Sequence, residues 1–153
     1  MKKAFTMIEI IFVVVILGIL VAIALPRLGS VREDAVISKG KAEVASIRSG
    51  LALLKSQRLL EGNLTLPPKL DKAENDTPGA LLFNAGDYGN VLSSPIYAKE
   101  TNKDNGWTKI DDTTYKYYIS GTAVSFTYST TAGTFDCNAS DATTARNCKL
   151  LTQ

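Results

Sequence analysis

The sequence predicts an α+β fold in which one long N-terminal helix packs on an antiparallel β-sheet. Two observations lead to this prediction. Apolar residues fill an uninterrupted run near the N-terminus and then recur at helical spacing, whereas the C-terminal third alternates apolar and polar residues as half-buried strands do. A helical region followed by a run of strands is typical of an α+β domain. The 153 residues suffice for one domain with a buried core.

Residues 5–25 form the apolar run, which contains a single charged residue, Glu9. As a helix rising about 1.5 Å per residue, this run is about 30 Å long, close to the hydrocarbon thickness of a bilayer. It lacks the polar stripe of a water-facing helix, so we expect it to lie in lipid or inside an assembly. Lys2 and Lys3 precede it and are expected to stay cytoplasmic, which places the region after Pro26 across the membrane.

Glu9 is the unusual residue of this run, because a carboxylate within lipid costs about 2–4 kcal/mol. Two interpretations account for it. Glu9 lies four residues after Phe5, on the same face of a helix, so a cut between Ala4 and Phe5 would create an ammonium group with which the carboxylate can pair, within one subunit or between neighbours. Alternatively, Glu9 reaches the headgroups and complements the positive end of the helix dipole.

The sequence KKAFTMIE at residues 2–9, followed by the apolar run and Pro26, resembles the type III signal sequence of prepilins and pseudopilins. The resemblance covers about residues 1–34. It implies that a prepilin peptidase removes residues 1–4 as a leader and methylates the Phe5 amine, and that Glu9 then neutralises the Phe5 amine of an adjoining subunit. Members of this family usually carry Gly where this chain has Ala4, which is also small, so cleavage is still expected.

The resemblance also implies a role for the whole chain. Residues 5–26 would be the transmembrane and assembly helix, in which Gly18 and Pro26 match places where the family's helix bends or loosens. Residues 27–153 would be a pilin-like periplasmic or extracellular domain. The implied protein is a structural subunit, not an enzyme, of a type IV pilus-like or type II secretion pseudopilus filament; DNA-uptake machines share this N-terminus.

The same resemblance implies a location and partners. The subunit would wait in the bacterial inner membrane with its N-terminus in the cytoplasm and its C-terminal domain in the periplasm, and then enter a periplasmic or cell-surface filament. Its partners would be identical or related pilin-like subunits, the prepilin peptidase and an inner-membrane assembly platform.

An ordinary secretory signal peptide is the main alternative. Lys2 and Lys3 are a fair basic n-region, and the sequence Ala-Ile-Ala at residues 22–24 is an A-x-A cleavage site. Cleavage there would release a secreted or periplasmic binding module that begins at Leu25. A third interpretation is that the apolar run is not cleaved and remains as a membrane anchor. The length of the apolar run and the acid at its head favour pilin-like processing.

From Arg27 to about Leu60 the sequence again predicts helix, which Pro26 kinks without ending. One apolar stripe runs along it at spacings of three and four and is expected to pack on the sheet; it consists of Val44, Ile47, Leu51 and Leu54. Gly40 and Gly50 weaken this helix, and the sequence Gly-Asn at 62–63 followed by Pro-Pro at 67–68 ends it.

Residues 61–106 read as a long irregular loop, held to the core by the apolar groups at 81–83 and 91–92. Strands are predicted at 107–110, 115–119 and 123–128, with a tight turn at Ser120-Gly121 and a short edge strand at 133–135.

Cys137 and Cys148 are expected to form a disulfide, because the predicted topology places them in an oxidising compartment. Closing this loop would stabilise the fold by about 3 kcal/mol in the chain-entropy model. The intervening segment is almost without apolar residues and is expected to be a loop ordered by the bridge. A C-terminal disulfide loop also resembles that of many type IV pilins.

Composition argues against several other functions. The net charge is +2, and with Lys2 and Lys3 set aside (17 − 2 = 15) the basic and acidic residues balance at 15 each, so no nucleic-acid partner is indicated. The chain has no histidine, no CxxC and no nucleophile motif, which leaves no zinc site and no recognisable hydrolase site.

Two weaker signals remain open. No cofactor is expected, although four carboxylates without EF-hand spacing would offer oxygens to calcium: Asp111, Asp112, Asp136 and Asp141. Asn63 and Asn138 each lie in an N-x-S/T triplet with an acid two residues earlier, as bacterial N-glycosylation sites do. Such triplets also arise by chance in a chain rich in Asn, Ser and Thr.

Overall fold

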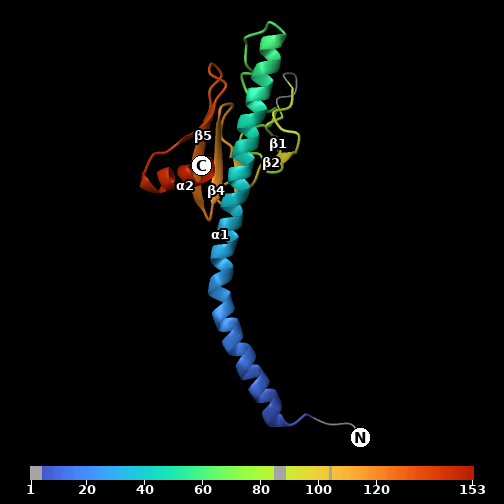
Figure 1. Cartoon of the computed structure of the whole chain (residues 1–153), viewed down its shortest axis with the longest axis vertical. Coiled ribbons are helices and arrows are strands. Elements are labelled where there is room, and N and C mark those ends of the chain that lie inside the picture. The colour runs from blue at the N-terminus through green and yellow to red at the C-terminus, as the bar shows by residue number, and fades with distance from the viewer. Residues whose placement is uncertain (1–4, 85–88, 104) are drawn as a thin grey trace. The chain divides into compact units, whose positions relative to one another are not determined.

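The computed structural model describes residues 5–84, 89–103 and 105–153, without the side chains of residues 25–30. Two helices and six strands follow one another in it (Figure 1): α1 (Met7–Leu60), β1 (Leu81–Leu82), β2 (Ile96–Tyr97), β3 (Gly106–Lys109), β4 (Thr114–Ile119), β5 (Thr122–Tyr128), β6 (Phe135–Asn138) and α2 (Ala142–Thr152). The chain divides into two compact units, Met1–Ala35 and Val36–Gln153, which are described separately. The α+β, pilin-like class predicted from sequence is confirmed.

In the first unit, the described residues belong to the N-terminal part of α1 and the two residues before it. The helix is continuous through Pro26, as expected for a proline that does not end it. In the second unit, α1 ends at Leu60, also as predicted.

The second unit is built around a four-stranded antiparallel sheet of order β3-β4-β5-β6, in which each strand pairs with its neighbour in sequence. β4 and β5 are joined by the predicted tight turn, where both Ser120 (φ 47°) and Gly121 (φ 83°) adopt left-handed backbone. β6 is the predicted edge strand, shifted to Phe135–Asn138. The short β1–β2 pair within the long loop was not predicted, because two-residue strands carry no periodicity.

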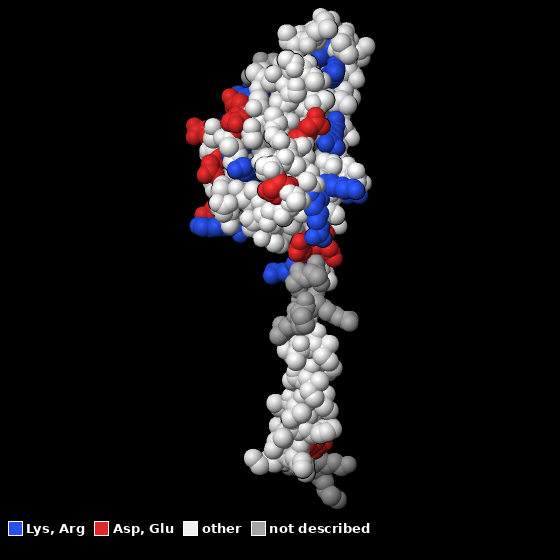
Figure 2. Space-filling view, turned by 90° about the vertical axis from the view of Figure 1, so that its left-hand side faces the viewer, with Lys and Arg blue, Asp and Glu red and all other residues white. Residues whose placement is uncertain are grey.

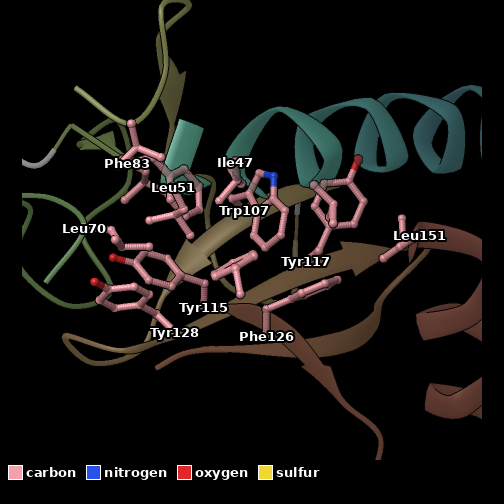
Figure 3. Close-up of a cluster of buried hydrophobic side chains, with 14 of the residues drawn as sticks. Ile47, Leu51, Leu70, Phe83, Trp107, Tyr115, Tyr117, Phe126, Tyr128 and Leu151 are labelled. Atoms are coloured by element: carbon pink, nitrogen blue, oxygen red, sulfur yellow. The ribbon is translucent and has the colours of Figure 1, made fainter. Parts of the chain in front are cut away.

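The core lies between α1 and the sheet. The predicted stripe of Val44, Ile47, Leu51 and Leu54 is buried, and Figure 3 shows Ile47 and Leu51 pointing toward the aromatic side chains of the sheet. Trp107 packs edge-to-face on Phe126, with the ring centroids 5.2 Å apart. The indole Nε1–H of Trp107 donates to Glu43 Oε2 at 3.0 Å. Burial raises the pKa of Glu43, an effect that nearby Lys39 and the Trp107 hydrogen bond only partly offset.

Gly40 and Gly50 permit close packing on this face of α1. A Cβ on Gly40 would lie 2.6 Å from the Tyr117 ring, and a Cβ on Gly50 would lie 1.8 Å from the backbone oxygen of Val91. The two glycines lower the intrinsic helix propensity of α1, but they permit close contacts that a side chain would prevent.

A buried polar cluster fixes the long loop to the sheet. Asp71 Oδ1 accepts from Lys109 Nζ at 2.9 Å, and Asp71 Oδ2 accepts from the Tyr115 hydroxyl at 2.7 Å and the Phe83 backbone N–H at 3.3 Å. Lys109 Nζ also donates to the Ala73 carbonyl at 2.8 Å. The apolar groups at 82–83 and 91 are buried as predicted. The loop is thus ordered by charge pairing as well as by apolar contact.

The C-terminal segment holds the predicted disulfide, Cys137–Cys148, with Cα atoms 5.8 Å apart. The segment between these residues was expected to depend on the bridge for its order, but its second half is also helical, because α2 begins at Ala142. Asp141 and Thr144 form a reciprocal capping box at its start, and Leu151 is fully buried. Helix capping, the disulfide and the buried Cys148 and Leu151 side chains order a segment that lacks a continuous apolar face.

Candidate assembly and processing site

The anchor segment, Met7–Ala24, is the described part of α1 that is long and apolar enough to cross a membrane. None of it is buried within the chain. Figure 2 shows the described surface here as almost free of charge, in contrast to the mixed charges of the second unit. A helical segment with a single charged residue and this many exposed large apolar side chains requires cover from lipid or from other protein.

Thr6 sets the start of this helix. The backbone N–H of Glu9 donates to the Thr6 carbonyl at 3.1 Å and to Thr6 Oγ1 at 3.4 Å, so Thr6 is the N-cap and Glu9 lies in the first turn. The sequence Thr6-Met7-Ile8-Glu9 has the T-x-x-E spacing of a capping box, a signal that the sequence analysis missed. Glu9 thereby complements the helix dipole, in line with the second of its two interpretations.

Phe5 lies outside the helix, which begins at Met7. The expectation that Phe5 and Glu9 share one helical face is therefore wrong for the uncut chain. Phe5 is exposed, and Ala4 lies outside the described residues. The Phe5 side of the expected cleavage point is thus in an exposed segment just ahead of a capped helix.

Gly18 and Pro26 are the other residues expected to act in assembly. A Cβ added to Gly18 would meet nothing within 4 Å, so packing within this chain does not explain a glycine there. Alanine at this position would favour the helix by about 1 kcal/mol, so Gly18 lowers the intrinsic stability of the helix. α1 continues through Pro26, whose side chain lies outside the described part.

The four candidate calcium ligands are used separately. Asp112 pairs with Lys109 at 3.2 Å, Asp136 with Arg48 at 3.5 Å, and Asp111 and Asp141 accept backbone N–H groups. In the described ranges, no group of three or more acidic, His or Cys side chains is placed to hold a metal ion.

Asp111 and Asp141 have shifted pKa values. The backbone N–H of Thr144, with that of Thr143, lowers the pKa of Asp141. Burial would raise the pKa of Asp111, but hydrogen bonds from Thr113 and Thr114 outweigh it and lower the pKa. Both shifts reflect structural roles at a turn and a helix start.

The two N-x-S/T triplets that follow an acid, at Asn63 and Asn138, lie in different settings. Asn63 follows the C-terminal end of α1 and is exposed, as are its four nearest neighbours in sequence. Asn138 ends β6, where it pairs with Ser125 next to the disulfide. Each keeps an exposed side chain, but only the first lies outside regular structure.

Comparison with known proteins points to one family. Residues 1–25 match the family described as the prokaryotic N-terminal methylation motif. Over 55 residues, which are 36% of this chain, the sequence is 44% identical to the type IV narrow pilus major component PilA5 of Thermus thermophilus. The chain spans about half the length of this curated relative, with 47% covered. No solved structure matches the chain significantly.

These similarities agree with the molecule itself. The matched motif covers the segment in which an apolar helix with one early acid begins, and the remainder folds as helix, antiparallel sheet and C-terminal disulfide. By its N-terminal motif, its similarity to a pilin over 55 residues and its α+β architecture, this chain is similar to the type IV pilins.

Proposed function

We propose that this chain is the structural subunit of a type IV pilus-like filament. The single observation that carries the proposal is the exposed anchor segment, joined to a folded body and preceded by the methylation motif. In this proposal the subunit waits in the inner membrane with its body in the periplasm. An inner-membrane assembly platform then extracts it into a fibre with identical or related pilin-like subunits.

The energetics of this transfer follow from the two environments. Lipid tails are as apolar as a bundle of Ile, Leu and Val side chains, so leaving the bilayer for the fibre gains little hydrophobic free energy. Close helix packing and polar pairing must favour the fibre instead. Gly18, which has open space around it in the subunit, would let a neighbouring helix approach closely.

Glu9 supplies the polar pairing in this proposal. Prepilin peptidase would cut between Ala4 and Phe5, which creates an ammonium group at Phe5, and would methylate it. In lipid the Glu9 carboxylate is costly, and in the fibre it would meet the Phe5 ammonium of a neighbour. The pair would therefore favour the assembled state and fix the axial register of adjoining subunits.

A pilus is favoured over a type II secretion pseudopilus because the similar protein is a pilus major component. A disulfide near the C-terminus agrees with pilus-like use, since a surface fibre benefits from a covalently fixed subunit exterior. The abundance of the subunit in the purified fibre would distinguish a major subunit from a minor one.

The test compares filament incorporation of Glu9 variants in cells. Glu9→Ala should reduce the amount of subunit in sheared surface fibres at least several-fold while the membrane pool remains, and Glu9→Asp should retain part of the function. Glu33→Ala removes another exposed acid of α1 outside the apolar run and serves as the matched control. Unchanged fibre yield from Glu9→Ala, with oxidised Cys137–Cys148 in both variants, would refute the role of Glu9.

A further inference from the structure

The C-terminal end of α1 presents a short, fully exposed segment, residues 61–65, with the sequence EGNLT. The helix ends in a Schellman motif, in which the Asn63 N–H donates to the Arg58 carbonyl at 2.9 Å and the Gly62 N–H donates to the Leu59 carbonyl at 3.1 Å. Gly62 takes the left-handed backbone (φ 72°) that this motif needs. Asn63 is therefore held just beyond a rigid helix end.

Asn63 is bonded within its own triplet. Its Oδ1 accepts from the Thr65 backbone N–H at 2.9 Å and from Thr65 Oγ1 at 2.6 Å. Within the described part of the chain, every hydrogen bond of residues 61–65 joins them to one another or to the last turns of α1. An enzyme can thus bind this segment in an extended form without opening the core.

The second triplet, at Asn138, is held by bonds to other parts of the domain. Asn138 is paired with Ser125 at the end of β6, and the preceding residue forms the disulfide. The N–H of Ser140 donates to Thr144 Oγ1 at 3.1 Å, at the capping box of α2. Drawing this triplet into an enzyme groove would break strand pairing and uncap a helix.

Two leucines beside Asn63 are an independent feature of this end of the molecule. Leu60 is 89% exposed and Leu64 is 81% exposed, far more than a soluble domain requires of large apolar side chains. They flank the asparagine on both sides in sequence. The apolar faces of sugar rings bound to Asn63 would cover them.

From exposure, local bonding and the acid two residues earlier, we propose that Asn63 is N-glycosylated in the exported protein and that Asn138 is not. The donor would be a lipid-diphosphate-linked oligosaccharide and the catalyst a membrane oligosaccharyltransferase. Asn63 Nδ2 loses one proton and forms a bond to C1 of the first sugar, while the bond from C1 to the phosphate oxygen breaks and the lipid diphosphate leaves. This inference goes beyond filament assembly. It rests on the proposed function only in requiring that the folded body be exported.

Peptide mass spectrometry of the full-length protein from its own cells tests this directly. Trypsin releases residues 59–69, which contain Asn63 as their sole asparagine, and residues 117–146, which contain Asn138 and stay joined to residues 147–149 by the disulfide. The first peptide should carry a sugar mass that fragments to Asn63, and the second should be unmodified. Asn63→Gln and Thr65→Ala should each abolish the added mass, whereas Thr65→Ser should retain it.

Asn138→Gln is the matched control and should leave the modification of residues 59–69 unchanged. Oxidised Cys137–Cys148 in the same digest marks exported protein. Unmodified Asn63 in that oxidised material, or sugar on residues 117–146 in its place, overturns the proposal.

Discussion

Lys109 Nζ lies 2.9 Å from Asp71 Oδ1, and neither side chain is more than 1% exposed. Lys109 also contacts Asp112 at 3.2 Å, but that carboxylate is 63% exposed. One lysine therefore has a buried and an exposed acidic partner. The buried partner also binds Tyr115 and Phe83, so it couples the long loop to the sheet.

This arrangement predicts unequal effects of two similar substitutions. Asp71→Asn should lower the free energy of unfolding by about 3–5 kcal/mol, because it leaves the buried Lys109 ammonium with only the exposed Asp112 carboxylate as a charged partner. Asp112→Asn, the matched control, should change it by less than about 1 kcal/mol, because an exposed pair contributes little. Denaturant unfolding of the full chain in detergent, with the disulfide intact, measures both. Equal effects of the two variants would contradict the assignment of Asp71 as the anchor of the loop.

Gly50 and Gly18 make a second matched pair, because both are helical glycines of α1. Gly50→Ala should destabilise the second unit by about 1–3 kcal/mol or more, since the new Cβ would overlap the backbone oxygen of Val91. Gly18→Ala meets no atom of its own chain and should leave that stability unchanged.

The two alanine variants also separate folding from assembly. If Gly18 serves contact between neighbouring helices, Gly18→Ala should lower fibre yield without altering the unfolding curve. The same denaturant titration, combined with fibre quantification, reads out both effects. A stable Gly50→Ala variant would show that the α1–loop contact at Val91 is looser than described.

Glu43 predicts a pH dependence of stability. Its folded-state pKa is raised above 4.5 by burial, so the folded state holds this proton more tightly than the unfolded state. By linkage, the contribution of Glu43 to the free energy of unfolding is largest at low pH. This contribution is lost as pH rises above the unfolded-state pKa. Glu43→Gln keeps an acceptor for the Trp107 indole and removes the titration.

Unfolding free energies of wild type and Glu43→Gln, measured from about pH 4 to about pH 7, check this expectation. The wild-type value minus the variant value should fall as pH rises. Parallel profiles across that range, or a difference that grows with pH, would show that Glu43 is not held in the half-buried position beside Trp107.

The sequence was most informative where one periodicity dominates a long segment. The apolar stripe from Val44 to Leu54 and the alternation at 123–128 located the α1 face and β5 correctly, because burial of one face enforces the pattern. Ser120 and Gly121 located the β4–β5 turn, since both positions need positive φ. The disulfide followed from compartment and cysteine count.

Other features depend on contacts between distant residues or on short local bonds. The Asp71–Lys109 pair joins residues 38 apart, so nothing near either residue in sequence reveals it. Helix α2 was missed because its polar sequence has no apolar stripe, although Asp141 and Thr144 carried a capping signal. The close approach of α1 to Val91 at Gly50 is likewise visible only in the folded chain. Thr6, by contrast, carried the T-x-x-E signal within the candidate site itself.

Mass determination of the N-terminus of the protein recovered from cells tests the central proposal, that the anchor segment is retained and used for assembly. The proposal predicts a mature chain that begins at Phe5 and carries a methyl group on its amine. A chain that begins at Leu25 would have lost the anchor segment to signal peptidase, and that result would contradict the assignment as a filament subunit.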